Sequence, residues 1–152
     1  LKEIWLDAKQ MRDERGLTLI ELLVVVVILG IIAAIAVVAI GGLIENSRKD
    51  AVVSDAKQLV SAAKLYTSSN PIKPGETVVM GVEKGGETFT ADDGVVLDKY
   101  IDSMEDPFNS PEKYTDAFVS VTESAGKYTY SVTLNGDEDY FTNKAPSALK
   151  RW

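Results

Sequence analysis

A single carboxylate, Glu21, stands at the start of a long apolar run near the N-terminal end of the sequence. Residues 22–44 contain no charged side chain and are mostly Val, Ile, Leu and Ala. A helix of that composition can span the ~30 Å hydrocarbon core of a bilayer. An ionisable side chain in or beside such a segment costs a few kcal/mol and usually has a partner. The pattern therefore predicts an ion pair made by Glu21.

The residues around Glu21 form a specific motif. The run GLTLIELLVV at residues 16–25 resembles the processing signal of type IV prepilins and of the pseudopilins of type II secretion and competence systems. The resemblance covers roughly residues 16–44. It implies that a prepilin peptidase cuts after Gly16 on the cytoplasmic side and methylates the new N-terminus at Leu17. It also implies that Glu21 neutralises the N-terminal ammonium of a neighbouring subunit during filament assembly.

Electrostatics agrees with that role. Cleavage after Gly16 leaves an α-ammonium on Leu17, four residues before Glu21, and methylation keeps the amine charged. A charge left unpaired in an apolar bundle costs several kcal/mol, so pairing enforces the axial register of the subunits. The alternative is an ordinary membrane anchor whose Glu21 reaches the headgroups. That alternative leaves Gly16 and the motif unexplained.

Composition excludes most other site chemistry. The chain carries 16 Lys and Arg against 23 Asp and Glu, a net charge of -7, and has neither Cys nor His. An acidic surface binds DNA phosphates poorly, so we expect no direct nucleic-acid binding. Thiol nucleophiles, thiolate or imidazole metal sites and imidazole acid–base groups are excluded. Because the remaining side chains show no nucleophile–base spacing, we expect a structural protein and not an enzyme.

The N-terminal elements follow from the motif and from periodicity. We expect a polar leader at 1–16, whose true start is Leu1 or Met11, and one long helix over 17–69, whose first half, 17–44, is the transmembrane and assembly segment. In its second half apolar residues recur at spacings of three and four. They predict a stripe that packs on a sheet, with subunit contact as the alternative: Val52, Ala56, Leu59, Ala63 and Tyr66.

The apolar half departs from the family in one respect. Type IV pilins usually carry a proline midway along it, whereas this chain has Val38 in that place. Without proline the helix keeps its hydrogen bonds there. Any local unwinding in a filament then depends on glycines, each costing ~1 kcal/mol relative to Ala. The glycines in question are Gly30, Gly41 and Gly42.

The connecting loop, 70–105, is Gly-rich and poorly periodic. Pro71 and Pro74 end the long helix before it. We expect a short strand at 77–82 and, after caps at Thr90 and Asp93, a short helix over 94–104. Three residues of that helix are predicted to face inward: Val96, Tyr100 and Ile101.

The run DPFNSP at 106–111 predicts an irregular turn. It is similar to a stretch in major pseudopilins of type II secretion, where the following region holds a calcium ion. The weak calcium candidates here are Asp102, Asp106 and Asp116. Oxygen-rich loops can bind Ca²⁺, but the spacing matches no EF-hand loop. We therefore expect no cofactor, with calcium as the alternative.

Alternation of apolar and polar residues predicts a three-stranded antiparallel sheet within 115–143. Its strands cover 118–122, 127–134 and 140–142, with Asn135-Gly136 as a hairpin turn. The sheet should cover the helical stripe, and the tail, 145–152, should be peripheral. The predicted fold class is α+β, the pilin fold: a long N-terminal helix packed on a small sheet. The soluble head, 45–152, would combine the helix 45–69, the loop and the sheet.

These features predict the structural subunit of a type IV pilus. The chain would begin as a single-pass precursor in the cell membrane with a cytoplasmic N-terminus. It would end in an extracellular filament that serves adhesion, motility or DNA uptake. Its expected partners are copies of itself, the prepilin peptidase, the assembly platform membrane protein and the motor ATPase machinery. Two alternatives stay open: a pseudopilin of a type II secretion or competence system, and a membrane-tethered binding domain that never polymerises.

Overall fold

The computed structural model describes the backbone of residues 2–102 and 104–152, with the side chains of 17–102 and 104–152. The predicted leader, 1–16, with its cleavage residue Gly16 and its alternative starts, lies outside the residues described in full. The chain divides into two units, Leu1–Ile44 and Glu45–Trp152.

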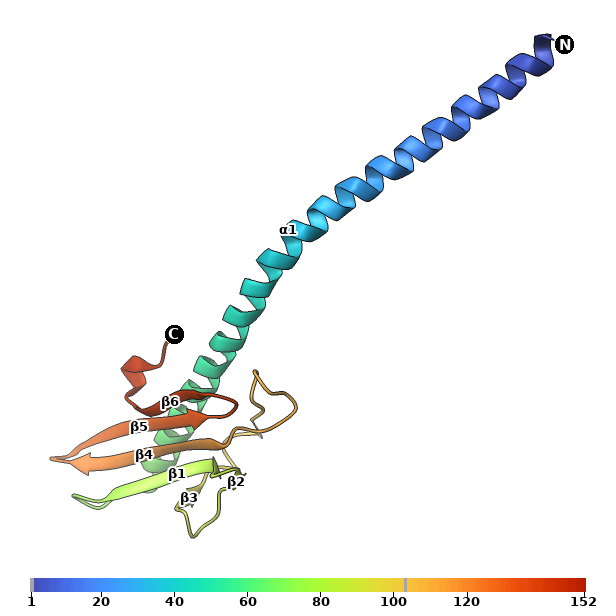
Figure 1. Ribbon diagram of the computed structural model, residues 1–152. Coiled ribbons are helices and arrows are strands. Elements are labelled where there is room, and N and C mark those ends of the chain that lie inside the picture. The colour runs from blue at the N-terminus through green and yellow to red at the C-terminus, as the bar shows by residue number, and fades with distance from the viewer. Residues whose placement is uncertain (1, 103) are drawn as a thin grey trace. The chain divides into compact units, whose positions relative to one another are not determined.

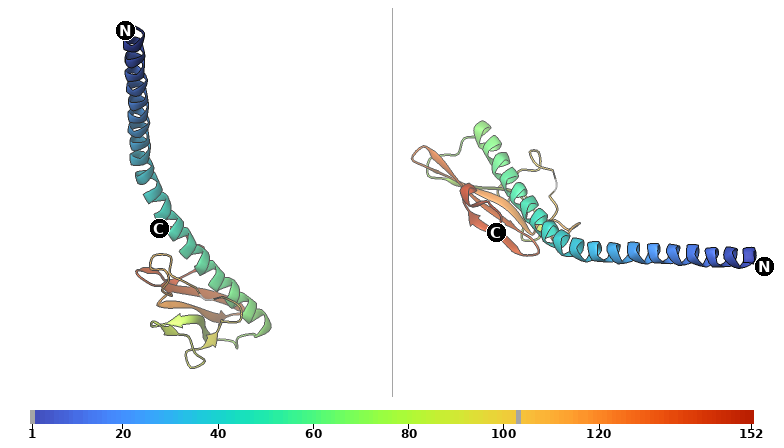
Figure 2. Two further views of the ribbon diagram at one scale, coloured as in Figure 1. Left: turned by 90° about the vertical axis from the view of Figure 1, so that its right-hand side faces the viewer. Right: turned by 90° about the horizontal axis from the view of Figure 1, so that it is seen from above.

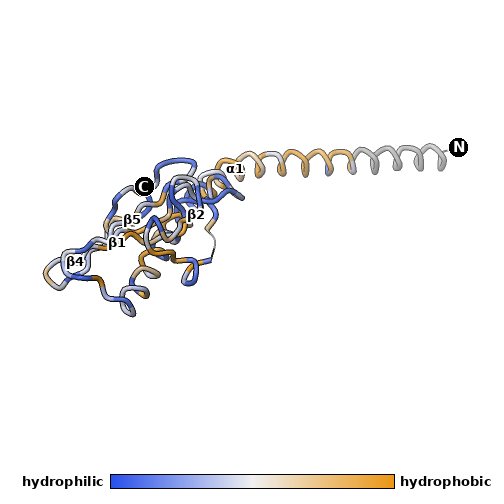
Figure 3. The backbone as a smooth tube through the Cα atoms, turned by 90° about the horizontal axis from the view of Figure 1, so that it is seen from below, coloured by the Kyte–Doolittle hydropathy of each residue, from blue (hydrophilic) through white to orange (hydrophobic). Residues whose placement is uncertain are grey.

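One helix, α1 (Lys2–Ser69), runs through the first unit and forms one layer of the second (Figure 1). Its apolar run appears in orange in Figure 3. Many of these residues are β-branched and are only moderate helix formers in water. In an apolar medium, however, a helix satisfies every backbone hydrogen bond within the segment. The helix ends as predicted at Ser69, where the Asn70 amide donates to the Tyr66 carbonyl oxygen at 2.9 Å and a proline follows.

The head, Glu45–Trp152, has two layers, with a sheet lying against one side of the C-terminal part of α1 (Figure 2). The predicted stripe is confirmed: its first four members are fully buried and Tyr66 is half-buried. The buried face is wider than the stripe, because three further residues of α1 join the core: Val53, Val60 and Ala62.

The three predicted strands are confirmed as β4 (Asp116–Ser124), β5 (Lys127–Asn135) and β6 (Asp139–Lys144). The predicted strand number is wrong, however, because within the described residues the sheet has six strands in the order β2-β1-β4-β5-β6, with β3 beside β1. The added strands come from the connecting loop: β1 (Thr77–Lys84), β2 (Glu87–Thr88) and β3 (Val95–Val96). A short 3-10 helix, η1 (Pro146–Ala148), follows the sheet.

Strand β1 includes the predicted short strand and extends it to Lys84. It pairs antiparallel with β4, from Thr77 opposite Thr122 to Glu83 opposite Ala117. Gly81 allows this pairing, because a Cβ atom there would lie 2.5 Å from the Ala117 carbonyl oxygen. The loop therefore contributes a strand to the interior of the sheet.

The predicted helix over 94–104 is wrong. Its first residues form β3, which pairs in parallel with β1, and Gly94 has φ +150°, which is not helical. Leu97 is the fully buried residue of this stretch, whereas Tyr100, expected to face inward, is exposed. Of the other two predicted inward residues, Ile101 is buried and Val96 is partly exposed. Because β3 pairs with β1, an earlier part of the chain, the segment does not adopt the helix that its local periodicity predicted.

The prediction that the tail, 145–152, is peripheral is also wrong. Leu149 is buried in the core of the head. The Arg151 Nε atom donates to Oδ1 of Asp50 at 2.8 Å, and Lys49 Nζ donates to the main-chain oxygen of Trp152 at 3.0 Å. The tail therefore folds back onto α1.

Candidate functional site

The apolar half of α1, 17–44, is almost entirely exposed. Its large apolar side chains, from Leu17 to Ile44, are between 46% and 79% exposed. By length and composition this helix can cross a membrane, with a mean hydropathy of 3.5 in its most apolar window. Exposed apolar surface of this extent requires lipid or other protein around it. The segment is therefore built for contacts outside its own chain.

Glu21 lies near the N-terminal end of this segment and its side chain is exposed. Leu17 precedes it by one helical turn, so both residues lie on one face of α1. Within the residues described in full, no group forms a hydrogen bond or ion pair with the Glu21 carboxylate. The two predicted assembly residues thus lie one helical turn apart with the carboxylate exposed, and their role in assembly stays a prediction.

The three glycines singled out for flexibility lie inside α1. A Cβ atom at Gly30, Gly41 or Gly42 would meet nothing within 4 Å. Packing within the chain therefore does not require glycine at these positions, and their role in helix flexibility stays a prediction.

Asp106 is buried, and its carboxylate accepts several hydrogen bonds that the sequence did not predict. Its carboxylate accepts hydrogen bonds from the Phe108 amide at 3.0 Å, the Asp137 amide at 2.7 Å and the Tyr140 hydroxyl at 2.8 Å. These bonds join the turn at 106–111 to the connection between β5 and β6. The sequence signal was an acid next to proline, which predicts a turn but not its distant partners.

The three calcium candidates are not brought together. Asp106 is committed to the donors above, Asp116 accepts from the Gly85 amide at 2.8 Å, and Asp102 is exposed. Across the described side chains no group of three or more acidic, His or Cys residues is arranged to hold a metal. Calcium binding stays a prediction without geometric support.

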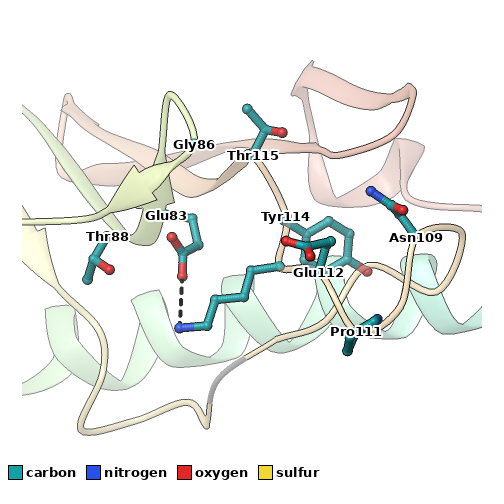
Figure 4. Close-up of a pocket in the computed structure, with 9 residues that line it drawn as sticks. Glu83, Gly86, Thr88, Asn109, Pro111, Glu112, Tyr114 and Thr115 are labelled. Carbon is teal, nitrogen blue, oxygen red and sulfur yellow. Dashed lines mark ion pairs between the residues drawn. The ribbon is translucent and has the colours of Figure 1, made fainter.

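A polar recess of about 540 Å³ lies between the β1–β2 hairpin and the segment 109–115 (Figure 4). Lys113 reaches Glu83 across it, with 3.7 Å between Nζ and Oε1. Burial raises the pKa of Glu83, and the Lys113 charge opposes that shift. The arrangement is a carboxylate–ammonium pair lining a polar surface. Such a pair alone does not provide the nucleophile and oriented base that catalysis needs.

Tyr114 connects this recess to α1. Its hydroxyl donates to Oδ2 of Asp55 at 2.6 Å, and the tyrosine is almost fully buried. Burial raises the pKa of Asp55, while the hydrogen bond from Tyr114 lowers it. Burial and the neighbouring carboxylates raise the pKa of Tyr114. The pair fixes the segment 109–115 against the helix.

Comparisons with known proteins agree with the motif. Residues 11–37 match the family described as "Prokaryotic N-terminal methylation motif". The chain is similar to type II secretion system core protein G of Vibrio cholerae serotype O1, with 39% identity over 75 residues, covering 49% of this chain and 50% of that protein. It is also similar to the protein of that name from Klebsiella pneumoniae, with 39% identity over 64 residues, covering 42% of this chain and 46% of that protein.

The chain thus spans about half the length of the curated relatives that it matches. No solved structure matches it at a significant level. The α+β arrangement of one long, N-terminally apolar helix and a mainly antiparallel sheet is the fold that the motif implied. The matched motif and the two relatives support the resemblance of this chain to pilins and pseudopilins.

Proposed function

We propose that this chain is the structural subunit of a helical filament, cleaved after Gly16 and methylated at Leu17. The observation that carries the proposal is the exposure of the whole apolar half of α1 together with Glu21 at its start. In the precursor, lipid surrounds this segment. In the filament, the same segments of many copies surround one another.

The ion pair of Glu21 explains why a subunit joins the filament in one axial register and not in others. Moving apolar side chains from lipid to neighbouring apolar helices changes their burial little, since both surroundings exclude water. An unpaired carboxylate among packed apolar helices, by contrast, costs several kcal/mol. Pairing Glu21 with the ammonium of Leu17 on a neighbouring subunit removes that cost. It does so only in the correct axial register.

The rest of the pathway follows from this role. The precursor is a single-pass membrane protein, and a prepilin peptidase processes it. An assembly platform protein and a motor ATPase extract it into the filament. The chain itself performs no catalysis in this scheme.

Two kinds of filament fit these features. A surface type IV pilus accounts for the motif. A pseudopilus of type II secretion is favoured by a separate observation, since both relatives above are named as type II secretion system core proteins. Immunolabelling separates the two: a pilus extends beyond the cell surface, whereas loss of a pseudopilin abolishes secretion without removing surface fibres.

The filament role is tested by Glu21→Gln, which keeps the shape of the side chain and removes its charge. The matched control is Glu45→Gln, an exposed carboxylate beyond the other end of the apolar run. We expect Glu21→Gln to be processed and membrane-inserted but to yield less than a tenth of the sedimentable fibre, because about 1.4 kcal/mol already corresponds to tenfold. Glu45→Gln should assemble normally. A normal fibre yield from Glu21→Gln would contradict the assembly role of Glu21, whereas a wild-type chain that forms no fibre would support the tethered, non-polymerising domain.

A further inference from the structure

The polar recess between the β1–β2 hairpin and the segment 109–115 has a buried carboxylate in its wall. Glu83 lies near the end of β1 and is only 7% exposed. Among the described residues its carboxylate pairs only with Lys113, whose Nζ lies 3.7 Å from Oε1, farther than an ordinary hydrogen bond. A carboxylate removed from water is stabilised most by donors at hydrogen-bond distance. Glu83 can therefore accept a stronger cationic partner.

Lys113 holds its place in the recess only loosely. The dashed line in Figure 4 marks its ion pair with Glu83, and its side chain is 53% exposed. A lysine ammonium stands on a flexible four-carbon stem and is strongly hydrated. It can therefore turn out into water and keep its charge solvated. The pair is one that a better donor can displace.

The rest of the lining offers oxygen acceptors. Glu112 supplies a second carboxylate, and the amide of Asn109 and the hydroxyl of Thr88 lie in the same recess (Figure 4). All three residues are exposed, so a ligand can reach them from solvent. The lining carries two carboxylates against the single ammonium of Lys113. Its formal charge is therefore negative, and it becomes more negative when the lysine turns out.

A guanidinium group suits this lining better than an ammonium does. It presents five N–H donors in a planar fork, binds a carboxylate through two parallel hydrogen bonds and is more weakly hydrated than an ammonium. Its remaining donors match the second carboxylate and the amide and hydroxyl oxygens. The recess, at about 540 Å³, lies within the size range of ligand pockets, which begins at roughly 300 Å³. An arginine side chain therefore fits it in both size and chemistry.

The sequence limits which arginine of a second copy is available. The chain contains four, of which Arg12 and Arg15 lie in the predicted leader and leave with it under the proposed function. Arg151 already forms its ion pair with α1. Arg48 is exposed, and among the described residues it has no ion-pair partner. Because a filament packs copies side by side, Arg48 of a neighbouring copy is the free guanidinium.

We propose that the recess at Glu83 binds the guanidinium group of Arg48 from a second copy of this chain. In the free subunit Lys113 fills the site, and it turns out into water when the arginine enters. Glu83 accepts two N–H bonds from the guanidinium, and Glu112 accepts from its remaining donors. The contact joins two heads and acts in addition to the pairing of Glu21. The identity of the partner rests on the proposed function, whereas the chemistry of the recess does not.

A titration of the full chain in detergent micelles tests the recess without assembly. The backbone amides of 109–115 are followed by NMR as N-acetyl-arginine amide is added, with the uncharged N-acetyl-citrulline amide as the matched ligand. We expect the arginine compound to bind at least ten times more tightly. Glu83→Gln and Glu112→Gln should each weaken that binding, whereas Glu76→Gln, an exposed carboxylate outside the recess, should leave it unchanged.

The same titration tests the role of Lys113. Lys113→Ala removes the competing ammonium, so it should tighten the binding of the arginine compound several-fold, whereas Lys127→Ala, an equal charge change outside the recess, should not. Equal affinity for the arginine and citrulline compounds would overturn the site. So would weaker binding in Lys113→Ala, because the lysine would then be part of the site and not its competitor.

Cross-linking in fibres tests the partner, and it is specific because the sequence contains no cysteine. One chain carries Ser47→Cys, next to Arg48, and the other carries Asn109→Cys in the lining of the recess; both positions are exposed. After co-assembly, a short bismaleimide should join the two chains. Adding Arg48→Gln to the first chain should lower the yield of joined chains several-fold. Ser69→Cys, at the end of α1, is the control in place of Ser47→Cys and should give little product.

The outcomes separate the contact from the filament. Fibres in which the cross-link forms equally well with Arg48→Gln, or equally well from Ser69→Cys, would overturn the contact. A chain without substitutions that forms no fibre would contradict the proposed function instead. The micelle titration decides on the recess in either case.

Discussion

The hydroxyl of Tyr140 lies 2.8 Å from Oδ1 and 3.0 Å from Oδ2 of Asp106, and both residues are buried. Burial and the Asp106 carboxylate raise the pKa of Tyr140, so the phenol stays protonated and donates. Through this bond the turn at 106–111 is fixed to β6, the strand against which Trp152 packs. Asp106 therefore organises the end of the head where the tail folds back.

Asp106→Asn should destabilise the head by about 2–4 kcal/mol, because hydrogen bonds to a charged group are strong and an amide cannot accept on both sides. The Asn nitrogen would face an N–H or O–H donor. Urea unfolding of the full chain in detergent micelles, followed by near-ultraviolet circular dichroism, measures the change. Tyr140→Phe removes only one donor to Asp106 and should destabilise the head less, by about 1–2 kcal/mol. Equal stability of Asp106→Asn and the wild type would contradict the role of Asp106.

Gly136→Ala should also destabilise the head, for a reason of space. A Cβ atom at Gly136 would overlap Oδ2 of Asp106, and overpacking typically costs about 1–3 kcal/mol. Asp106→Asn keeps an atom where Oδ2 stands, so adding it should not restore the stability of Gly136→Ala. Asp106→Gly removes that atom. In its presence, Gly136→Ala should lower the free energy of unfolding little further. Double-mutant analysis of the unfolding free energies checks this. Additive effects would show that the two sites do not touch.

Sequence reasoning succeeded where the signal was local and periodic. The stripe from Val52 to Tyr66 and the alternation in β5 each specify one buried face, and both faces meet in the core. It failed where distant pairing decides the outcome. The parallel pairing of β3 with β1 overrode an apparent helical spacing at Val96 and Tyr100, and no local pattern signals the bond between Arg151 and Asp50, about a hundred positions apart.

The candidate site also has parts that the sequence could predict and parts that it could not. The assembly segment with Glu21 was visible because a membrane-length apolar run and a short motif are properties of sequence alone. The recess at Glu83 and Lys113 was not, since it forms only when the β1–β2 hairpin meets the segment 109–115. The acidic residues near Asp106 were calcium candidates by residue type, but their hydrogen-bond partners could not be predicted from spacing.

Asp55→Asn should change how stability depends on pH. Burial raises the pKa of Asp55 above its ordinary value of 3.8, so the folded chain holds this proton more tightly than the unfolded chain. The resulting stability is present below the unfolded pKa and is lost as pH rises through the folded pKa. The unfolding free energy of the wild type minus that of Asp55→Asn should therefore fall between acid and neutral pH. Urea titrations across that range measure it, and a difference that is flat or rises with pH would contradict the assignment.

Tyr114→Phe tests the same pair from the other side. The Tyr114 hydrogen bond lowers the pKa of Asp55, so its removal should raise that pKa further. The carboxyl carbon of Asp55, observed by NMR in micelles, should titrate at higher pH in Tyr114→Phe than in the wild type. An unchanged or lower midpoint would mean that the hydroxyl does not bond to the ionised carboxylate.

Gly41→Ala and Gly42→Ala test the flexibility assigned to α1. Because a Cβ atom meets nothing at either position, each substitution should stabilise the helix by about 1 kcal/mol. Amide hydrogen exchange of the following residues in micelles should slow by roughly fivefold for each change. Fibre yield should fall if the glycines unwind on assembly. Full assembly with the slower exchange would show that the filament keeps this part of α1 helical.

The central claim is that the exposed apolar half of α1, freed at Leu17, is the polymerising surface. Mass spectrometry of the N-terminus of protein sheared from cells and sedimented as fibre tests it most directly. We predict a chain that begins at methylated Leu17. An intact leader in the fibre, or processed chain recovered only from the membrane in cells that carry the whole assembly machinery, would contradict the claim.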